Sequence, residues 1–242
     1  MIGLGTLINT CAIIAGGIIG IFLKKGLPER YKNTIIQTVG LAVMIVGISG
    51  ALQSMYIVVE EGHLSREYIM LMVLSLVIGG IVGEFLNIEE YLNKMGMWFK
   101  QKLSFNDSNF SQGFVGASLL FCVGAMAIVG SLEDGLAGNP GTLIAKSILD
   151  GVTAMVFAST LGVGVVFSSI PVLVYQGGIT LLAGFLKPWL TDVVISQMSL
   201  VGSVLIMAIG INMLEIKKLK TGNMLPAIFI PLIYYMLSHL IR

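Results

Sequence analysis

Long apolar stretches follow one another along this chain and are separated by short polar segments. A helix needs about 20 mostly apolar residues to cross roughly 30 Å of hydrocarbon. The pattern therefore predicts an all-α, polytopic bundle of transmembrane helices, with residues 1–242 forming a single transmembrane domain. Eight stretches qualify as spans: 3–23, 35–55, 68–86, 114–132, 142–166, 172–186, 198–214 and 225–241. The sixth stretch is short and residues 162–171 before it are partly helical in character, so seven spans are the alternative.

The amino-acid composition excludes other classes of protein. Hydrophobic residues make up 56% of the chain and charged residues 11%, against roughly 25% charged residues in ordinary soluble domains. The mean hydropathy is +0.94. The net charge of +1 gives no indication of a nucleic-acid partner. Cys11 and Cys122 both lie inside apolar stretches, so they predict neither a disulfide framework nor a metal site.

The orientation follows from the lysines and arginines in the short loops. The loops after spans one, three and seven carry Lys24, Lys25, Arg30, Lys32, Lys94, Lys100, Lys102, Lys217, Lys218 and Lys220. The opposite side carries only Arg66, Lys187 and Arg242. The first span has no cleavage pattern after it, so we interpret it as uncleaved. We therefore expect a multi-pass protein of a bacterial cytoplasmic membrane, with both termini outside.

Glycines recur at helical spacing in two of the predicted spans. The segment GGIIGIFL at 16–23 is echoed by GGIVGEFL at 79–86, and a weaker echo closes span six. The echoes suggest an inverted repeat of spans 1–3 and 6–8, an arrangement typical of secondary transporters. Small residues four apart let helix backbones approach closely. The helix-packing positions predicted in this way are Gly16, Gly20, Gly79 and Gly83, either within a subunit or within a homo-oligomer.

Polar side chains inside apolar spans are costly and mark candidate functional sites. Asp150 lies eight residues beyond Thr142, so it is expected to be about 12 Å deep in span five. Lys146 is one turn shallower on the same face, next to Ser147, and can pair with Asp150. One interpretation is a purely structural ion pair. The other makes Asp150 an ion or proton site, with Lys146 as its charge partner.

Several uncharged polar residues extend the list of candidates for a substrate or ion pathway. They are Asn9, Gln176, Asn212 and Ser131, although an amide within a span is often only a hydrogen-bonding contact between helices. Glu133 and Asp134 are expected either in a solvated outer loop or at an outer mouth that concentrates cations. The pairs Gly162/Gly164 and Gly177/Gly178, with Ser168, Ser169 and Pro171, are candidate helix breaks at depth.

Signatures of enzymes are absent from the sequence. The two histidines, His63 and His239, are far apart, and no phosphate-binding loop, HExxH helix or nucleophile elbow occurs. We therefore expect no catalytic residue, no resident metal and no cofactor.

The middle of the chain contains a series of distinctive motifs: Cys122-Val123-Gly124 through Ser131, Asp134-Gly135-Leu136, Lys146-Ser147, Asp150-Gly151, Phe157-Ala158-Ser159 and Tyr175-Gln176-Gly177. With these motifs the chain resembles the YdfK/YqgA-type family. The resemblance extends over nearly the whole chain, including Asn9 and Gly16-Gly17. Members of that family are bacterial integral membrane proteins of uncharacterised function, often labelled as transporters. The resemblance implies a bacterial membrane protein without established enzyme activity, and it names no substrate.

Two functions from different classes are consistent with these features. The first is a transporter or channel in the lipid bilayer for an unknown small solute or ion, with Lys146 and Asp150 in its pathway. The second is a non-transporting membrane scaffold or accessory subunit, in which the buried polar groups only fix helix packing.

Overall fold

The computed structural model describes residues 1–25, 29–58, 64–92, 94, 110–122 and 125–240, and these are mostly helical. The longer helices are α1 (Leu4–Lys25), α2 (Glu29–Met55), α3 (Ile69–Leu86), α5 (Phe110–Cys122), α6 (Ala125–Ala137), α7 (Gly141–Leu161), α9 (Ser169–Leu181), α11 (Asp192–Met213) and α12 (Ile230–Leu240). Shorter elements are α8 (Gly164–Phe167), α10 (Ala183–Leu186) and the 3-10 helix η2 (Gly222–Phe229). Strands β1 (Tyr56–Val58) and β2 (Leu64–Arg66) form an antiparallel hairpin between α2 and α3.

The all-α, polytopic architecture predicted from the sequence is confirmed. Within the described ranges, six helices are long and apolar enough to cross a membrane, and α5 with α6 would make a seventh. The axes of α5 and α6 differ by 59°, so the predicted span 114–132 is bent in the structure. The predicted span 225–241 is divided between η2 and the 11 residues of α12, and α12 alone is too short to cross.

The boundary between the fifth and sixth spans differs from the prediction. Helix α7 ends at Leu161, and Gly162 has φ 77° and ψ −150°, a conformation that is accessible essentially to glycine alone. Pro171 does not break a helix, because it lies in the first turn of α9, where a missing N–H disrupts no helical hydrogen bond. Helices α8 and α9 are separated only at Ser168, and together they form one span-length segment, Gly164–Leu181. Gly177 and Gly178 also remain helical within α9.

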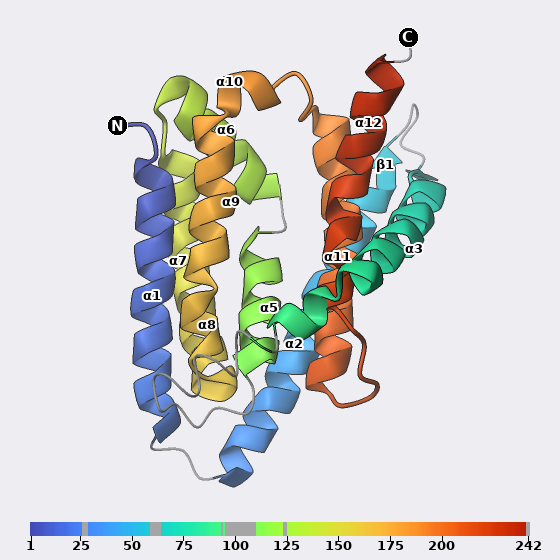
Figure 1. Cartoon of the computed structure of the whole chain (residues 1–242). Coiled ribbons are helices and arrows are strands. Elements are labelled where there is room, and N and C mark those ends of the chain that lie inside the picture. Colours follow the sequence, from blue (N-terminus) through green and yellow to red (C-terminus); the bar gives the residue numbers. More distant parts are fainter. Residues whose placement is uncertain (26–28, 59–63, 93, 95–109, 123–124, 241–242) are drawn as a thin grey trace. The chain divides into compact units, whose positions relative to one another are not determined.

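The chain divides into two compact units, each built from separate stretches of sequence. The first unit contains Met1–Val39 and Glu90–Lys187, and the second contains Gly40–Glu89 and Pro188–Arg242. In the first unit, α1, α7 and α9 run alongside one another (Figure 1). Whether the chain acts as one transmembrane domain stays a prediction.

Glycines allow the closest helix crossings inside the first unit. A Cβ atom on Gly16 of α1 would overlap the backbone carbonyl oxygen of Gly151 in α7, and one on Gly20 would overlap the carbonyl oxygen of Met155. Gly164 of α8 approaches the backbone of Phe110 in α5 in the same way. Side chains at these positions would force the helices apart, so the crossing of α1 and α7 depends on glycine.

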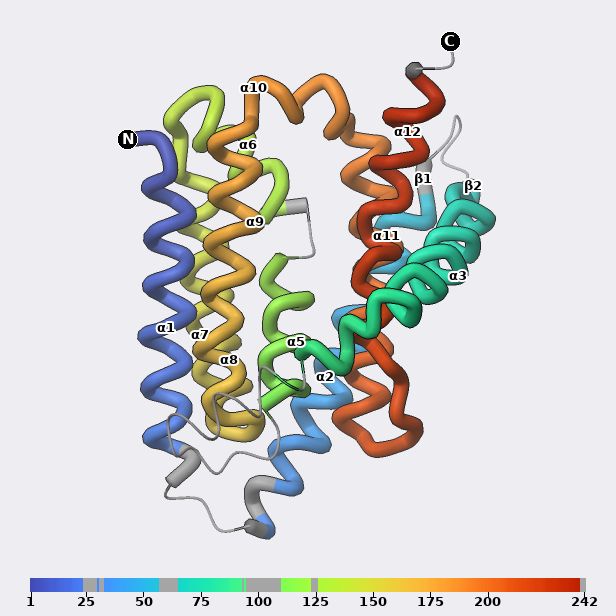
Figure 2. Tube along the Cα trace, in the orientation of Figure 1, coloured from blue at the N-terminus to red at the C-terminus, as the bar shows by residue number. Residues whose placement is uncertain are grey.

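The second unit is organised around α11, most of whose residues are buried. Helix α11 packs on α2 at Gly47, where a Cβ would overlap the backbone of Met207, and at Gly210, which meets the backbone of Met44. Helix α3 crosses η2 through Gly79 and Gly83, which approach the backbones of Ala227 and Asn223. The trace in Figure 2 shows α3 crossing α12 obliquely.

Candidate functional site

The candidate site begins with the buried face of α1, which carries polar residues near its start and glycines further along. Thr6, Asn9 and Thr10 are buried, with exposed fractions of 2%, 0% and 8%. This face continues to Gly16 and Gly20, where α1 meets α7 backbone to backbone. Because Gly151 lies at that crossing, its neighbour Asp150 is brought against the first half of α1. The close crossing therefore positions Asn9 beside Asp150.

Asp150 and Lys146 form an ion pair one turn apart on α7. The Lys146 Nζ atom lies 2.5 Å from Asp150 Oδ2, and each side chain is only 8% exposed. The ammonium group also lies 5.9 Å from the ring centre of Phe121, at the end of α5. A pair this deeply buried loses the hydration of both charges and needs additional hydrogen bonds to compensate.

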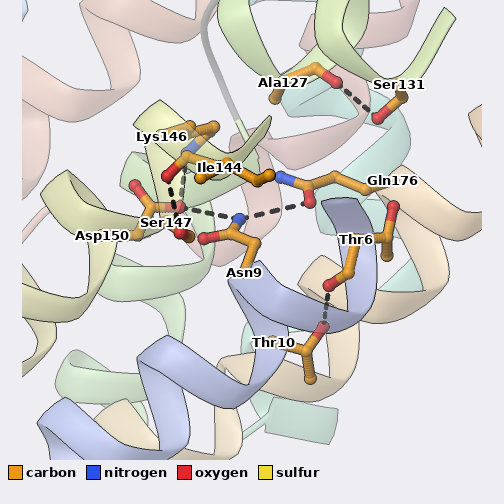
Figure 3. A network of polar contacts seen from close by, with 10 residues as sticks. All are labelled: Thr6, Asn9, Thr10, Ala127, Ser131, Ile144, Lys146, Ser147, Asp150 and Gln176. Atoms are coloured by element: carbon orange, nitrogen blue, oxygen red, sulfur yellow. Dashed lines mark hydrogen bonds and ion pairs between the residues drawn. The ribbon is translucent and has the colours of Figure 1, made fainter. Parts of the chain in front are cut away.

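Two amides from other helices supply such hydrogen bonds. Asn9 Nδ2 donates to Asp150 Oδ2 over 3.0 Å and to Gln176 Oε1 over 3.2 Å. Figure 3 shows Asn9 lying between Asp150 and Gln176, so that α1, α7 and α9 meet in one polar network. Gln176 and Asn9 are both 0% exposed. The structure thus joins four of the residues singled out from the sequence.

The network leaves two of its polar atoms unused. Among the described residues, Asn9 Oδ1 and Gln176 Nε2 are buried and have no hydrogen-bond partner. One is an acceptor and the other a donor of two hydrogens. Buried polar atoms are nearly always paired in native proteins, with protein or with ordered water. The site therefore has spare capacity to bind a water molecule or another small polar species.

The remaining predicted residues lie around this network or elsewhere. Ser147 is buried beside the ion pair, but its hydroxyl donates to the Ile144 carbonyl. Ser131 is fully buried in α6 and donates to the Ala127 carbonyl. Asn212 belongs to the second unit, where its amide holds the N–H and C=O of Leu219 at 2.7 and 2.9 Å. Asn212 therefore closes the turn after α11.

The expectation that Asp134 lies in a solvated outer loop is wrong. It lies inside α6 and is 0% exposed. Its Oδ2 atom accepts the Gly5 N–H at the start of α1 over 3.1 Å. Glu133 beside it is half-buried and accepts the Thr142 hydroxyl over 2.6 Å. The missed signal is the buried stripe of Ala127, Ser131 and Asp134, which places the carboxylate on the inner face of α6.

The sequence analysis did not single out two further buried residues, both threonines. Thr6 Oγ1 and Thr180 Oγ1 lack partners among the described residues, and their exposed fractions are 2% and 3%. A threonine within a helix can return its hydroxyl to a carbonyl of the preceding turn, as Thr10 does to Thr6 over 2.8 Å. Thr6 and Thr180 do not, so their hydroxyls remain available for other partners.

The site combines charged groups with uncharged hydrogen-bonding groups. The described residues contain no group of three or more His, Cys, Asp or Glu side chains placed to hold a metal ion. What they offer is one ion pair, two amides and several free oxygens within apolar helices. Such an arrangement can bind and release a proton, a small ion or a small polar solute.

Comparison with known proteins gives the family and leaves the activity open. The chain is 36% identical over 236 residues to the "Uncharacterized membrane protein YdfK" of Bacillus subtilis (strain 168), covering 97% of this chain and 96% of that protein. It is 32% identical over 232 residues to the "Uncharacterized protein YqgA" of Escherichia coli (strain K12), covering 94% of each. No solved structure matches the chain. These relatives confirm the resemblance that the motifs indicated. A family model described as "Protein of unknown function (DUF554)" matches residues 4–236, and the chain belongs to that family.

Proposed function

We propose that the protein carries a small solute or ion across a bacterial cytoplasmic membrane, with Asp150 as the binding group of its pathway. The observation that carries the proposal is the buried network in which Asn9 and Gln176 meet the Lys146–Asp150 pair. Ionisable groups within membrane-spanning helices are expensive and usually mark a pathway. A solute or ion that binds Asp150 competes with Lys146, so binding loosens contacts between α1, α7 and α9.

The bent pair α5–α6 adds support from the geometry of the helices. Transporter sites are often formed where a helix is interrupted, because its two half-helix ends present partial charges to the bound ion. The last turn of α5 holds Phe121 next to the Lys146 ammonium. Helix α5 therefore ends near the ion pair, and the axis of α6 differs from the axis of α5 by 59°.

The first test compares Asp150→Asn with wild type in proteoliposomes, using dyes for proton, sodium, potassium and chloride fluxes. The matched control is Asp192→Asn, which removes an exposed carboxylate from the first turn of α11. We expect Asp150→Asn to abolish a flux that Asp192→Asn leaves intact, with both variants eluting as folded protein. Wild-type flux in Asp150→Asn would instead favour the scaffold, in which the pair only fixes packing.

Access of water to the site is a second, independent test. Cysteines replace Ser147 and Thr153, on either side of Asp150, in a background lacking Cys11 and Cys122. Labelling by a membrane-impermeant thiol reagent is expected, because a transport pathway must open to water in at least one state. Complete protection from both sides, in folded protein, would contradict the proposed pathway.

Further parts of the proposal concern the chain's setting in the membrane. Both termini lie outside, because the basic loops mark the cytoplasmic side. A cysteine at Lys218, which is exposed after α11, should then react only from the cytoplasm. We also propose that spans 1–3 and 6–8 form an inverted repeat and that the protein forms a homo-oligomer without enzymatic activity. Cross-linking in native membranes tests the oligomer.

A further inference from the structure

The orientation of the two amides in the polar network follows from the carboxylate of Asp150. Asp150 Oδ2 is paired with the Lys146 ammonium and acts as an acceptor, so the Asn9 atom that faces it over 3.0 Å is the amide nitrogen. The second hydrogen of that nitrogen is donated to Gln176 over 3.2 Å, so the Gln176 atom at this contact is the amide oxygen. One polar atom of each amide, Asn9 Oδ1 and Gln176 Nε2, therefore takes no part in these hydrogen bonds.

These two atoms are an acceptor and a donor on neighbouring side chains. Both are buried without a partner among the described residues, and both side chains are 0% exposed. Each atom is separated by only two covalent bonds from an atom of the hydrogen bond between Asn9 and Gln176, so one small molecule can bind both. Such a molecule must donate a hydrogen bond to Asn9 and accept one from Gln176.

The charges of the network restrict the bound molecule further. Lys146 and Asp150 are its charged members, and they compensate each other at 2.5 Å. A lone cation at Asp150 would leave the Lys146 ammonium buried without its counter-charge, and a lone anion at Lys146 would do the same to the carboxylate. The Phe121 ring, 5.9 Å from the ammonium, is uncharged and cannot replace the carboxylate. A net-neutral molecule leaves neither charge uncompensated.

The hydrogen-bonding groups of the network fall into two complementary sets. Asp150 and Asn9 Oδ1 are acceptors, whereas Lys146 and Gln176 Nε2 are donors. Figure 3 shows these four side chains converging from α1, α7 and α9. A molecule with a donor at one end and an acceptor at the other can bind one set with each end. Primary amides and amino-acid zwitterions have this polarity, while a metal cation, an alkylammonium ion or a carboxylate anion offers only one of the two ends.

We infer that the site binds a small, net-neutral solute that carries both a hydrogen-bond donor and an acceptor, as a primary amide or an amino-acid zwitterion does. This inference rests on the proposed transport function and names the substrate class of the same site. The donor end of the solute replaces Lys146 at Asp150 and binds Asn9 Oδ1. The acceptor end binds Gln176 Nε2 and the released ammonium, and no covalent bond changes. An ion that uses this pathway then crosses only together with the solute.

Saturation-transfer NMR of the protein in lipid nanodiscs tests binding without requiring transport. The probes are four molecules of similar size: acetamide and glycine, which are net neutral, and ethylammonium and acetate, which are lone ions. We expect the better neutral probe to bind roughly tenfold or more tightly than either ion, because only a neutral probe leaves both charges compensated. The ranking of acetamide and glycine distinguishes an uncharged amide from a zwitterion. Equal binding of an ion would overturn the inference, as would binding of none of the four, which would leave water as the occupant.

The variant Gln176→Leu connects binding with the free donor of the site. It removes Nε2, so the affinity for the better neutral probe should fall by roughly tenfold or more, as expected for loss of a buried hydrogen-bonding group. The matched control is Gln53→Leu, which removes an exposed amide of α2 and should keep the wild-type affinity. Undiminished binding in folded Gln176→Leu would overturn the inference. If Gln176→Leu does not fold, the ranking of the four probes in wild type decides alone.

Uptake of the better neutral probe into proteoliposomes separates the substrate class from the proposed function. We expect uptake that is lost in Asp150→Asn and retained in Asp192→Asn, and any dye-reported ion flux should rise when the probe is added. A flux of sodium or potassium that depends on Asp150 and ignores the probe would overturn the substrate class and leave the proposed function standing. Binding of the probe without transport of the probe or of any ion would refute the proposed function and leave a binding site.

Discussion

Removing one partner of the Lys146–Asp150 pair should destabilise the protein far more than removing both. In Lys146→Met, the carboxylate of Asp150 stays buried and keeps only the Asn9 hydrogen bond of 3.0 Å. Breaking a buried pair in this way costs about 3–5 kcal/mol. For a chain of this length, 1 kcal/mol shifts Tm by roughly 2–4 °C, so Tm should fall by roughly 6–20 °C.

The double variant Lys146→Met/Asp150→Leu completes the thermodynamic cycle. Apolar side chains of similar volume often replace a buried ion pair at little cost. The double variant should therefore be more stable than either single variant, so the costs of the two single changes should be far from additive. Thermal unfolding in detergent, followed by circular dichroism, measures all four proteins.

A second lysine–carboxylate pair in the same chain provides the control. Lys94 and Glu90 are also four residues apart, at 2.7 Å, but their side chains are 60% and 58% exposed. The hydrogen bond from Lys94 lowers the pKa of Glu90, yet water solvates both charges without the pair. Lys94→Met should leave Tm within experimental error. The reasoning is refuted if Lys146→Met is as stable as wild type, or if both lysine variants lose stability equally.

The other predictions concern helix packing and the second unit. Gly16→Ala should cost about 1–3 kcal/mol, because its Cβ would overlap the Gly151 carbonyl, while Gly178→Ala, with nothing within 4 Å, should be neutral in the same thermal assay. Asn223→Ala should cost about 1–3 kcal/mol, because its side chain bonds the Glu84 carboxylate at 2.6 Å and the Glu89 N–H at 2.7 Å. Hydrogen exchange should accelerate in η2 for that variant, and it should stay unchanged in Lys220→Ala, which removes a side chain that is 61% exposed.

Most of the helices could be predicted because the bilayer imposes a simple length rule on apolar segments. The predicted spans 3–23, 35–55 and 68–86 agree closely with Leu4–Leu23, Asn33–Met55 and Ile69–Leu86. Helix α11 begins six residues before the predicted span 198–214, because Thr191 caps it by accepting the Val194 N–H. Apolar content alone carries no information about such a cap.

The breaks between helices were predicted less well, because they depend on backbone conformation. Proline at position 171 suggested a break, but a proline in the first turn of a helix is tolerated. The chain turns instead at Gly162, where φ is positive. Pairs of glycines occur throughout this sequence, and the sequence does not reveal that Gly164 packs against the backbone of α5 while Gly178 has no close neighbour.

Only part of the candidate site could be predicted from the sequence. Lys146 and Asp150 are recognisable because two opposite charges four residues apart stand out in an apolar helix. Thr6 and Thr180 do not stand out, since a helical threonine normally bonds its own backbone. Asp134 was misplaced because its neighbours Glu133 and Gly135 suggested a loop. Its burial depends on α1 beginning beside it, which is a contact across more than 120 residues of sequence.

Helices α1 and α3 can be compared to ask whether the polar network around Asp150 is needed for helix packing. The glycine stripe of α1 recurs in α3, where Gly79 and Gly83 cross η2 as closely as Gly16 and Gly20 cross α7. The residue seven positions before Gly16 is Asn9, and the one seven positions before Gly79 is Met72. Helix α3 therefore makes an equally close crossing without an amide at that position. Close packing of a glycine stripe therefore does not require an amide at that position, and the proposed transport function gives Asn9, Asp150 and Lys146 a role beyond packing.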